Sequence, residues 1–321
     1  MASVLISGDT SGSITISAPA ISGSNTLTLP AVTDTLVGKA TTDTLTNKTL
    51  TSPTITGATI TTTTSTQFKN VIHGLTYDNG TDATNDLNIN TGGASDATGV
   101  YWMNLATALG KQSDAAWAVG GTTGTPLGGL DTGTVGNSDY YVWLIARSDT
   151  GVVDALYSLS STAPTMPASY DYKRLIGWMK RVGGTIVAMK TYETEGGGIE
   201  QIWSVPTLDV DLSNTLTTAR RTDAVKVPLN FSTTAHLNVA LSDTSAPIAV
   251  WVYCPDQTDT APSATAAPLF NWGTAGSVAV AGSQAMRIRT SATGTIAARS
   301  TVATIDIYRV ATVGFTWARR N

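Results

Sequence analysis

The chain carries little charge for its length. Only 13 % of its 321 residues are charged, and 19 Lys and Arg face 23 Asp and Glu. A protein that binds nucleic acid needs a basic surface, because its cations must displace counterions from phosphate. The balance therefore argues against nucleic acid as a partner.

The sequence is equally poor in cysteine and in long apolar runs. A single cysteine, Cys254, cannot form an internal disulfide, so a disulfide-stapled framework is excluded. No stretch approaches the roughly 20 apolar residues that cross a bilayer. The opening Met-Ala-Ser-Val-Leu also lacks the basic and apolar regions of a signal peptide. We expect synthesis in a cytoplasm and no insertion into a membrane.

Aromatic residues are missing from the first fifth of the chain. The first one is Phe68, whereas residues 1–67 contain 20 Thr and five charged residues. A segment without large side chains cannot build a compact core alone, and its composition by itself would permit disorder. Polar and aliphatic residues nevertheless alternate at 13–17 and 26–29, which predicts two short strands.

A five-residue repeat occupies residues 44–61, which read TLTNK TLTSP TITGA TIT. Each unit contains Thr, Leu or Ile, and Thr, followed by two residues that suit a turn. The apolar centres are Leu45, Leu50, Ile55 and Ile60. One row of four aliphatic side chains cannot stabilise a monomer, because a repeat must stack on neighbours to bury its apolar face. Three chains wound around one axis would share these centres as the core of a trimeric β stem. A Thr-rich linker and a single-chain β-helix are the alternatives.

The remainder of the chain has the residue composition and strand patterns of globular β domains. Runs rich in aromatic and β-branched residues predict strands at 140–145, 175–179, 185–189, 236–241, 248–253 and 303–308. Gly183-Gly184 predicts a tight hairpin turn between two of them. Only residues 104–119 show a helical spacing of apolar residues, which Gly110 weakens. We expect two sandwich-like or jelly-roll-like domains, at 68–206 and 207–321, after the stem at 1–67. The Pro-rich loop at 255–268 is a candidate binding loop.

Several phrases resemble phage and prophage tail-fibre proteins. TLTNKTLTSPTI at 44–55 and SGSNTLTLPAVTDTLVG at 22–38 are similar to the starts of many virion appendages. DATNDLNI at 82–89, SDTGVVDALYS at 148–158 and APTMPASYDYKRLIGWM at 163–179 are similar to the C-terminal regions of prophage tail fibres. The resemblance implies an N-terminus that docks on other tail or head proteins of a virion, and a C-terminal half that faces the host.

The sequence offers no motif for catalysis. The sequence contains none of the motifs for a nucleophile elbow, a phosphate-binding loop, a dinucleotide-binding fold or a zinc protease. The two histidines, His73 and His236, fall in different predicted domains, so a serine triad or a zinc site within one chain is disfavoured. A sugar-cleaving spike would need two carboxylates across a cleft. The candidates are Asp154, Asp171, Glu193, Glu195 and Glu200. We predict no enzyme activity, no cofactor and no metal.

Positive charge gathers at the C-terminal end. Residues 281–321 contain six arginines and one acid. We expect a receptor-facing basic patch of Arg287, Arg289 and Arg299 that meets anionic envelope glycan. The alternative is that these arginines pair with acids of a neighbouring subunit or solvate strand faces. The sequence thus predicts a homotrimeric virion protein that binds a host surface glycan or protein, with a purely architectural virion component or a glycan-cleaving spike as alternatives.

Overall fold

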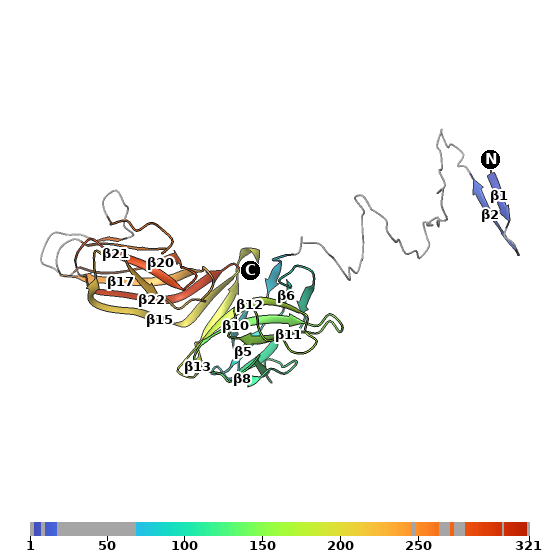
Figure 1. The fold of residues 1–321 in the computed structure, drawn as a ribbon, viewed down its shortest axis with the longest axis horizontal. Helices are drawn as coiled ribbons and strands as arrows, with labels where there is room; N and C mark the ends of the chain where they lie inside the picture. Colours follow the sequence, from blue (N-terminus) through green and yellow to red (C-terminus); the bar gives the residue numbers. More distant parts are fainter. Residues whose placement is uncertain are drawn as a thin grey trace. The chain divides into compact units, whose positions relative to one another are not determined.

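The computed structural model describes residues 3–7, 10–17, 69–244, 248–262, 270–272, 280–303 and 305–319. The chain forms two units, Met1–Thr59 and Ile60–Asn321. Figure 1 shows the strands of both. Among the described residues the only helical segment is a short 3-10 turn, η2 (Glu195–Gly197). The prediction of an all-β protein is confirmed.

The first unit contains one described hairpin. Strands β1 (Ser3–Ser7) and β2 (Ser13–Ser17) pair antiparallel, with Ser3 opposite Ser17 and Ser7 opposite Ser13. The strand predicted at 13–17 is therefore confirmed. The strand predicted at 26–29 lies outside the described residues, and so does the predicted stem core of Leu45, Leu50, Ile55 and Ile60.

The described residues of the second unit form twenty strands in three sheets. The largest has the order β13-β12-β10-β11-β9-β8-β5-β4-β14-β15-β22-β17-β20, and two smaller sheets have the orders β16-β21-β18-β19 and β3-β6-β7. The bounds are β3 Ile72–Gly74, β4 Tyr77–Asn79, β5 Asp86–Ile89, β6 Gly92–Ser95, β7 Trp102–Leu105, β8 Leu109–Ala116, β9 Leu127–Leu130, β10 Asp139–Ala146, β11 Val153–Ser158, β12 Tyr172–Val182, β13 Thr185–Ile186, β14 Met189–Glu193, β15 Ile199–Leu216, β16 Arg221–Ala224, β17 Thr234–Asp243, β18 Ile248–Tyr253, β19 Phe270–Trp272, β20 Val280–Arg289, β21 Thr295–Ser300 and β22 Ile305–Trp317.

The first lobe of this unit comprises strands β3 to β14. Its central strand β10 is buried on both faces, as expected for a run with almost no polar residue. Strands β12 and β13 are joined by Gly183 and Gly184, whose φ values of 61° and 82° favour glycine and form the predicted hairpin turn. The helical interpretation of residues 104–119 is wrong, because these residues form the end of β7 and the whole of β8.

Strand β15 links the two lobes. Its first residues, Ile199–Trp203, pair with β14 in the first lobe. It then continues beside β22 as far as Leu216, in the second lobe. The strand passes without interruption through residues 206 and 207, where the sequence analysis puts a domain boundary; that boundary stays a prediction.

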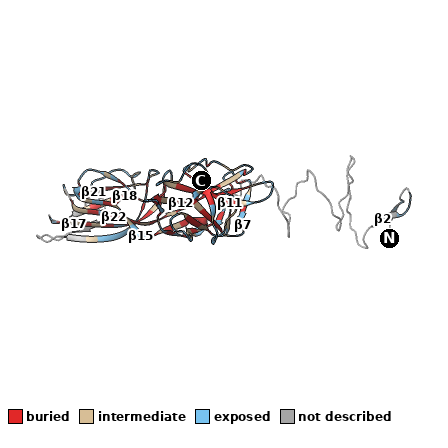
Figure 2. Cartoon of the chain, turned by 90° about the horizontal axis from the view of Figure 1, so that it is seen from below, coloured by how far each residue is buried: buried red, intermediate tan, exposed pale blue. Residues whose placement is uncertain are grey.

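The second lobe has two layers. Strands β15, β22, β17 and β20 form one layer, and β16, β21, β18 and β19 form the other (Figures 1 and 2). Alternate residues of β17 point between the layers, so Ala235, Leu237, Val239 and Leu241 are buried. Val250 and Val252 of β18 belong to the same core.

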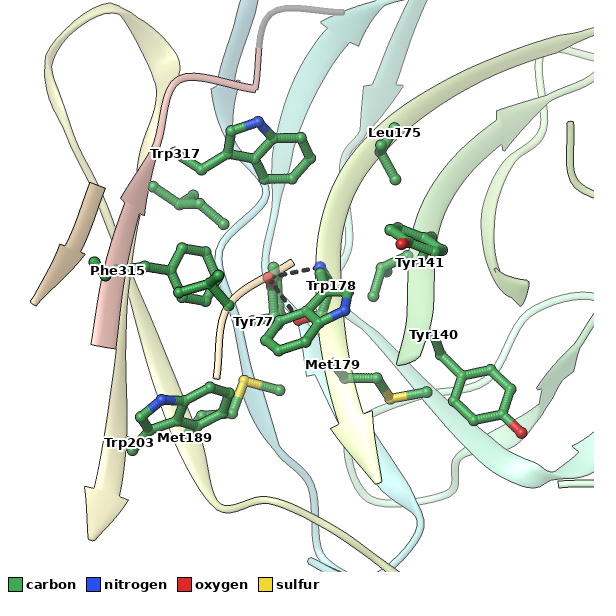
Figure 3. Packing of buried hydrophobic residues seen from close by; sticks show 14 of the residues in the cluster. Tyr77, Tyr140, Tyr141, Leu175, Trp178, Met179, Met189, Trp203, Phe315 and Trp317 are labelled. Atoms are coloured by element: carbon green, nitrogen blue, oxygen red, sulfur yellow. Dashed lines mark hydrogen bonds between the residues drawn. The ribbon is translucent and has the colours of Figure 1, made fainter. Parts of the chain in front are cut away.

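Aromatic rings fill the core where the lobes meet. Trp178 packs edge-on against Trp203 and Phe315, with ring centroids 5.8 and 5.6 Å apart (Figure 3). The hydroxyl of buried Tyr77 accepts the backbone N–H of Trp178 at 2.9 Å and donates to Oε1 of Gln201 at 2.9 Å. Burial raises the pKa of Tyr77, so the phenol stays protonated. These contacts join strands of both lobes.

A buried arginine ties the C-terminal tail to the start of the second unit. The Arg319 side chain donates to the carbonyl oxygens of Gly197 at 2.7 Å, Leu75 at 3.2 Å and Gly74 at 3.0 Å. Its own carbonyl accepts Nη2 of Arg174 at 2.7 Å. Burial lowers the pKa of Arg319 to about 10, so the guanidinium remains charged at neutral pH. The sequence analysis counts Arg319 with the surface charge of the basic end. That is wrong, because the residue is fully buried.

The loop between β6 and β7 is organised by one carboxylate. Asp96 accepts the backbone N–H groups of Thr98, Val100 and Tyr101 at 2.7 to 2.8 Å, and the Thr98 hydroxyl as well. Burial acts to raise the pKa of Asp96, but these hydrogen bonds to the ionised form outweigh it, so the pKa lies below its usual value.

Candidate binding surface of the second lobe

The second lobe has a hollow of about 610 Å³ at the place where β18 and β20 come together. Its size lies within the roughly 300–1,000 Å³ typical of ligand sites. The lining residues come from β18, from the turn that follows it, and from β20: Trp251, Val252, Tyr253, Cys254, Asp256, Gln257, Arg287, Ile288 and Arg289. We call this surface, together with Arg220, Asp259 and Arg299, the distal surface.

Two aromatic rings share one face of β18. The rings of Trp251 and Tyr253 are stacked, with centroids 4.2 Å apart and an angle of 23° between the planes. Val252, between them, points into the core, because successive side chains of a strand alternate between faces. The Trp251 ring is partly exposed. Tyr253 is only 1 % exposed, so Trp251 is the ring that can offer a flat apolar face to a sugar ring or a protein partner.

The ring of Tyr253 is held by charged neighbours. The Arg220 guanidinium lies 5.6 Å from the ring centroid. The Tyr253 hydroxyl donates to Oδ1 of Asp259 at 2.8 Å, and Nη1 of Arg299 contacts Oδ2 of the same carboxylate at 2.9 Å. Burial, together with the bond to Asp259, raises the pKa of Tyr253 to about 12. The ring is thus fixed and neutral at physiological pH.

Arg287 and Arg289 lie two residues apart on β20, so both point to the same face of the strand. The Arg287 side chain is 68 % exposed and reaches Glu200 only at 3.3 Å, so the pair leaves most of the arginine in water. The same oxygen of Glu200 lies 3.3 Å from Nδ1 of His236. Burial, followed by the charge of Arg287, lowers the pKa of His236 and keeps it neutral at pH 7. Arg289 is exposed and makes no ion pair with another described residue. Two cationic groups therefore face solvent beside the hollow.

The third arginine of the predicted patch lies on another strand of the distal surface, opposite Trp251 of β18. Arg299 belongs to β21, in the other sheet of the lobe, and is paired with Asp259. The structure brings Arg287 and Arg289 together on one strand and does not place Arg299 beside them on it. Farther along the basic end, Arg309 of β22 contacts Asp211 at 2.7 Å. Pairing within the chain thus neutralises part of the excess of arginine.

Four of the five carboxylates considered for sugar cleavage make local contacts. Asp154 forms a buried ion pair with Lys111 at 2.7 Å. Asp171 accepts a hydrogen bond from the Ser148 hydroxyl at 2.6 Å, and Glu193 accepts the backbone N–H of Gly74 at 2.9 Å. Glu195 lies in the 3-10 turn η2, and Glu200 contacts His236 and Arg287. Four of the five therefore accept contacts from their own surroundings.

The described residues offer neither a metal site nor a membrane-spanning helix. They contain no group of three or more His, Cys, Asp or Glu side chains that could hold a metal ion. The ring of His73 stacks on that of Trp102, with centroids 5.5 Å apart, whereas Nδ1 of His236 lies 3.3 Å from Oε1 of Glu200. No helix in the described part of the chain has the length and apolarity needed to span a bilayer.

Sequence reasoning found only part of the distal surface. It selected Arg287, Arg289 and Arg299 and the loop that begins at Pro255, but it treated Trp251 and Tyr253 merely as strand residues. The available signal was the spacing of the two rings, which places both on one face of the strand. The pairing of β18 with β21, about 45 residues later in the chain, could not be predicted from the spacing of residues in the sequence. No protein-family model and no curated protein sequence matches this chain.

Proposed function

We propose that the chain is an adhesive subunit of a phage virion, a tail fibre or receptor-binding protein, that works as a homotrimer. In this proposal the N-terminal segment forms the particle-proximal attachment and the trimeric stem, and the second lobe contacts the host. The sequence phrases that resemble those of phage tail fibres support the virion assignment. Three copies would raise avidity for a repetitive surface even where each contact is weak.

The observation that carries the adhesive role is the distal surface. A hollow of about 610 Å³ is lined by two solvent-facing arginines and by the partly exposed Trp251, whose ring stacks on that of buried Tyr253. Aromatic faces suit sugar rings, and arginine suits carboxylate and phosphate groups. This combination fits an anionic envelope glycan such as lipopolysaccharide.

Binding of purified protein to immobilised lipopolysaccharide, and to a panel of bacterial cells, tests the proposal. The double variant Arg287→Ser, Arg289→Ser should bind at least tenfold more weakly at low salt, and wild-type binding should fall as salt is raised. The control Arg147→Ser, Arg309→Ser removes the same charge from two arginines that are paired with acids outside the distal surface and should bind like wild type. Equal loss in both variants, or none in either, would end the assignment of this surface.

The two alternatives predict other results. A purely architectural virion component would bind particles and no cells. A glycan-cleaving spike would release reducing sugar from host polysaccharide. Sedimentation analysis of the purified protein tests the trimer separately: a mass of three chains is expected, and a monomer would contradict the proposed stem.

A further inference from the structure

A second hollow, of about 410 Å³, lies between elements of both lobes. We call it the inter-lobe cleft. It is bounded by β10, β12 and β15, by the segment after β16, and by a turn before β21. Its lining residues are Asp139, Trp178, Lys180, Asp209, Ala224, Val225, Lys226, Val227, Leu229, Thr293 and Gly294. The cleft shares no lining residue with the hollow of the distal surface.

Two acids and two lysines meet in this cleft. Asp139 and Lys180 form an ion pair at 2.7 Å. The Asp209 carboxylate accepts the backbone N–H of Lys226 at 2.8 Å and the hydroxyl of Thr312. The Lys226 ammonium, by contrast, makes no ion pair with a described residue within 4 Å. One of the four charged groups therefore lacks a direct partner in the described part of the chain.

The position of Lys226 leaves its charge poorly compensated. Burial lowers its pKa, the charge of Asp209 partly opposes this, and the Lys180 ammonium lowers the pKa further. A half-buried ammonium near a second ammonium is stabilised by any anion that reaches both, and the interaction strengthens where water is excluded. Because Lys180 is already paired with Asp139, Lys226 is the ammonium of the cleft with which an anionic group can still pair.

The remaining wall of the cleft is apolar. Val225 and Val227 are buried and Leu229 is partly exposed, all on one short segment. Such a wall suits the carbon face of a ring. The carboxylates of Asp139 and Asp209 can accept hydrogen bonds from hydroxyl groups. They also limit the charge of a ligand, because a dianion would face two carboxylates across a small cleft.

We propose that the inter-lobe cleft binds a monoanionic, hydroxylated ring compound, namely a sugar acid. Its carboxylate contacts Lys226 and Lys180, its ring packs on the Val225–Leu229 segment, and its hydroxyl groups donate to Asp139 and Asp209. This site is additional to the distal surface, and its occupancy does not depend on adhesion to cells.

Isothermal titration calorimetry of the full-length protein with D-glucuronate, D-glucose, acetate and glucose 6-phosphate tests the proposal. Glucuronate should bind at least tenfold more tightly than glucose, which lacks the charge, and than acetate, which lacks the ring. Glucose 6-phosphate should bind more weakly than glucuronate because it is a dianion near neutral pH. Glucose binding as tightly as glucuronate, or no heat with glucuronate, would overturn the proposal without any variant.

The variant Lys226→Met locates the site. It should weaken glucuronate binding about tenfold, since a charge-assisted hydrogen bond is lost. Lys190→Met makes the same change at an exposed lysine of β14 outside the cleft and should leave the affinity unchanged. Equal glucuronate affinity in Lys226→Met and wild type, with matching thermal unfolding, would refute the assignment. Because Arg287→Ser, Arg289→Ser should retain glucuronate binding, failure of the adhesion assay and failure of this one are distinguishable.

Discussion

Replacing Arg319 by alanine removes the guanidinium that joins the C-terminal tail to β3 and to the 3-10 turn η2. The wild-type side chain is fully buried and donates to three carbonyl oxygens, at 2.7, 3.0 and 3.2 Å. No carboxylate pairs with it at salt-bridge distance among the described residues. The three carbonyl groups therefore supply its main direct compensation.

Two opposing contributions set the size of the effect. Each hydrogen bond from a charged donor contributes about 1.5–3 kcal/mol to stability. Removing the charge also removes its desolvation cost, which is several kcal/mol for a buried ion. Three such hydrogen bonds, less the desolvation cost that disappears with the charge, leave a net loss of about 3 kcal/mol. For a unit of this size the loss corresponds to a fall in Tm of roughly 6–12 °C.

Chemical denaturation with thermal unfolding measures this loss, and hydrogen exchange locates it. In the variant, the backbone amides of β3 and of the turn near Gly197 should lose more protection from hydrogen exchange than those of β10. Arg309→Ala, which removes an exposed arginine paired with Asp211, is the control and should change stability by less than about 1 kcal/mol. If Arg319→Ala unfolds at the same denaturant concentration as wild type, the tail does not stabilise the fold as described.

Three further changes test the fold. Gly184→Val should cost about 1–2 kcal/mol because a β-branched residue is strained at a φ of 82°, whereas Gly184→Asn should be milder; equal stability of both in urea would contradict the turn geometry. Lys111→Met leaves Asp154 as an unpaired buried charge and should destabilise by about 3 kcal/mol in urea unfolding. Asp96 has a depressed pKa in the folded protein, so its contribution is present above the unfolded pKa near 4 and disappears as the pH falls through the lower folded value. The stability difference between wild type and Asp96→Asn, measured across pH 2–7, should therefore be about 2 kcal/mol at neutral pH and shrink in acid; a constant difference would contradict this.

Local patterns were sufficient to predict several strands and one turn. The apolar run at 140–145 lies inside β10, and Gly183-Gly184 adopts the predicted hairpin turn. The helical interpretation of 104–119 failed because a four-residue spacing, such as that of Leu105 and Leu109, also occurs when a strand ends and another begins. In addition, Lys111 and Ser113 of β8 are polar but buried, so β8 does not show the alternation of apolar and polar residues that predicts a strand.

Contacts between distant parts of the chain were beyond such reasoning. The burial of Arg319 depends on carbonyl groups of Gly74 and Leu75, about 245 residues away. The inter-lobe cleft combines groups such as Asp139 and Lys226 from separate strands and loops. Their proximity follows from the sheet order, which residue spacing in one sequence does not encode.

The uninterrupted course of β15 has a mechanical consequence. A hinge needs a few residues that can change φ and ψ freely, but the passage between the lobes runs along one 18-residue strand, which pairs with β22 on both sides of the register shift between Ile202 and Thr207. A force that separates the lobes would have to shear the β15–β22 ladder, where many bonds resist together, instead of bending a linker. We therefore expect the two lobes to rotate little relative to each other, and we expect them to separate under force only when the β15–β22 ladder breaks as a whole.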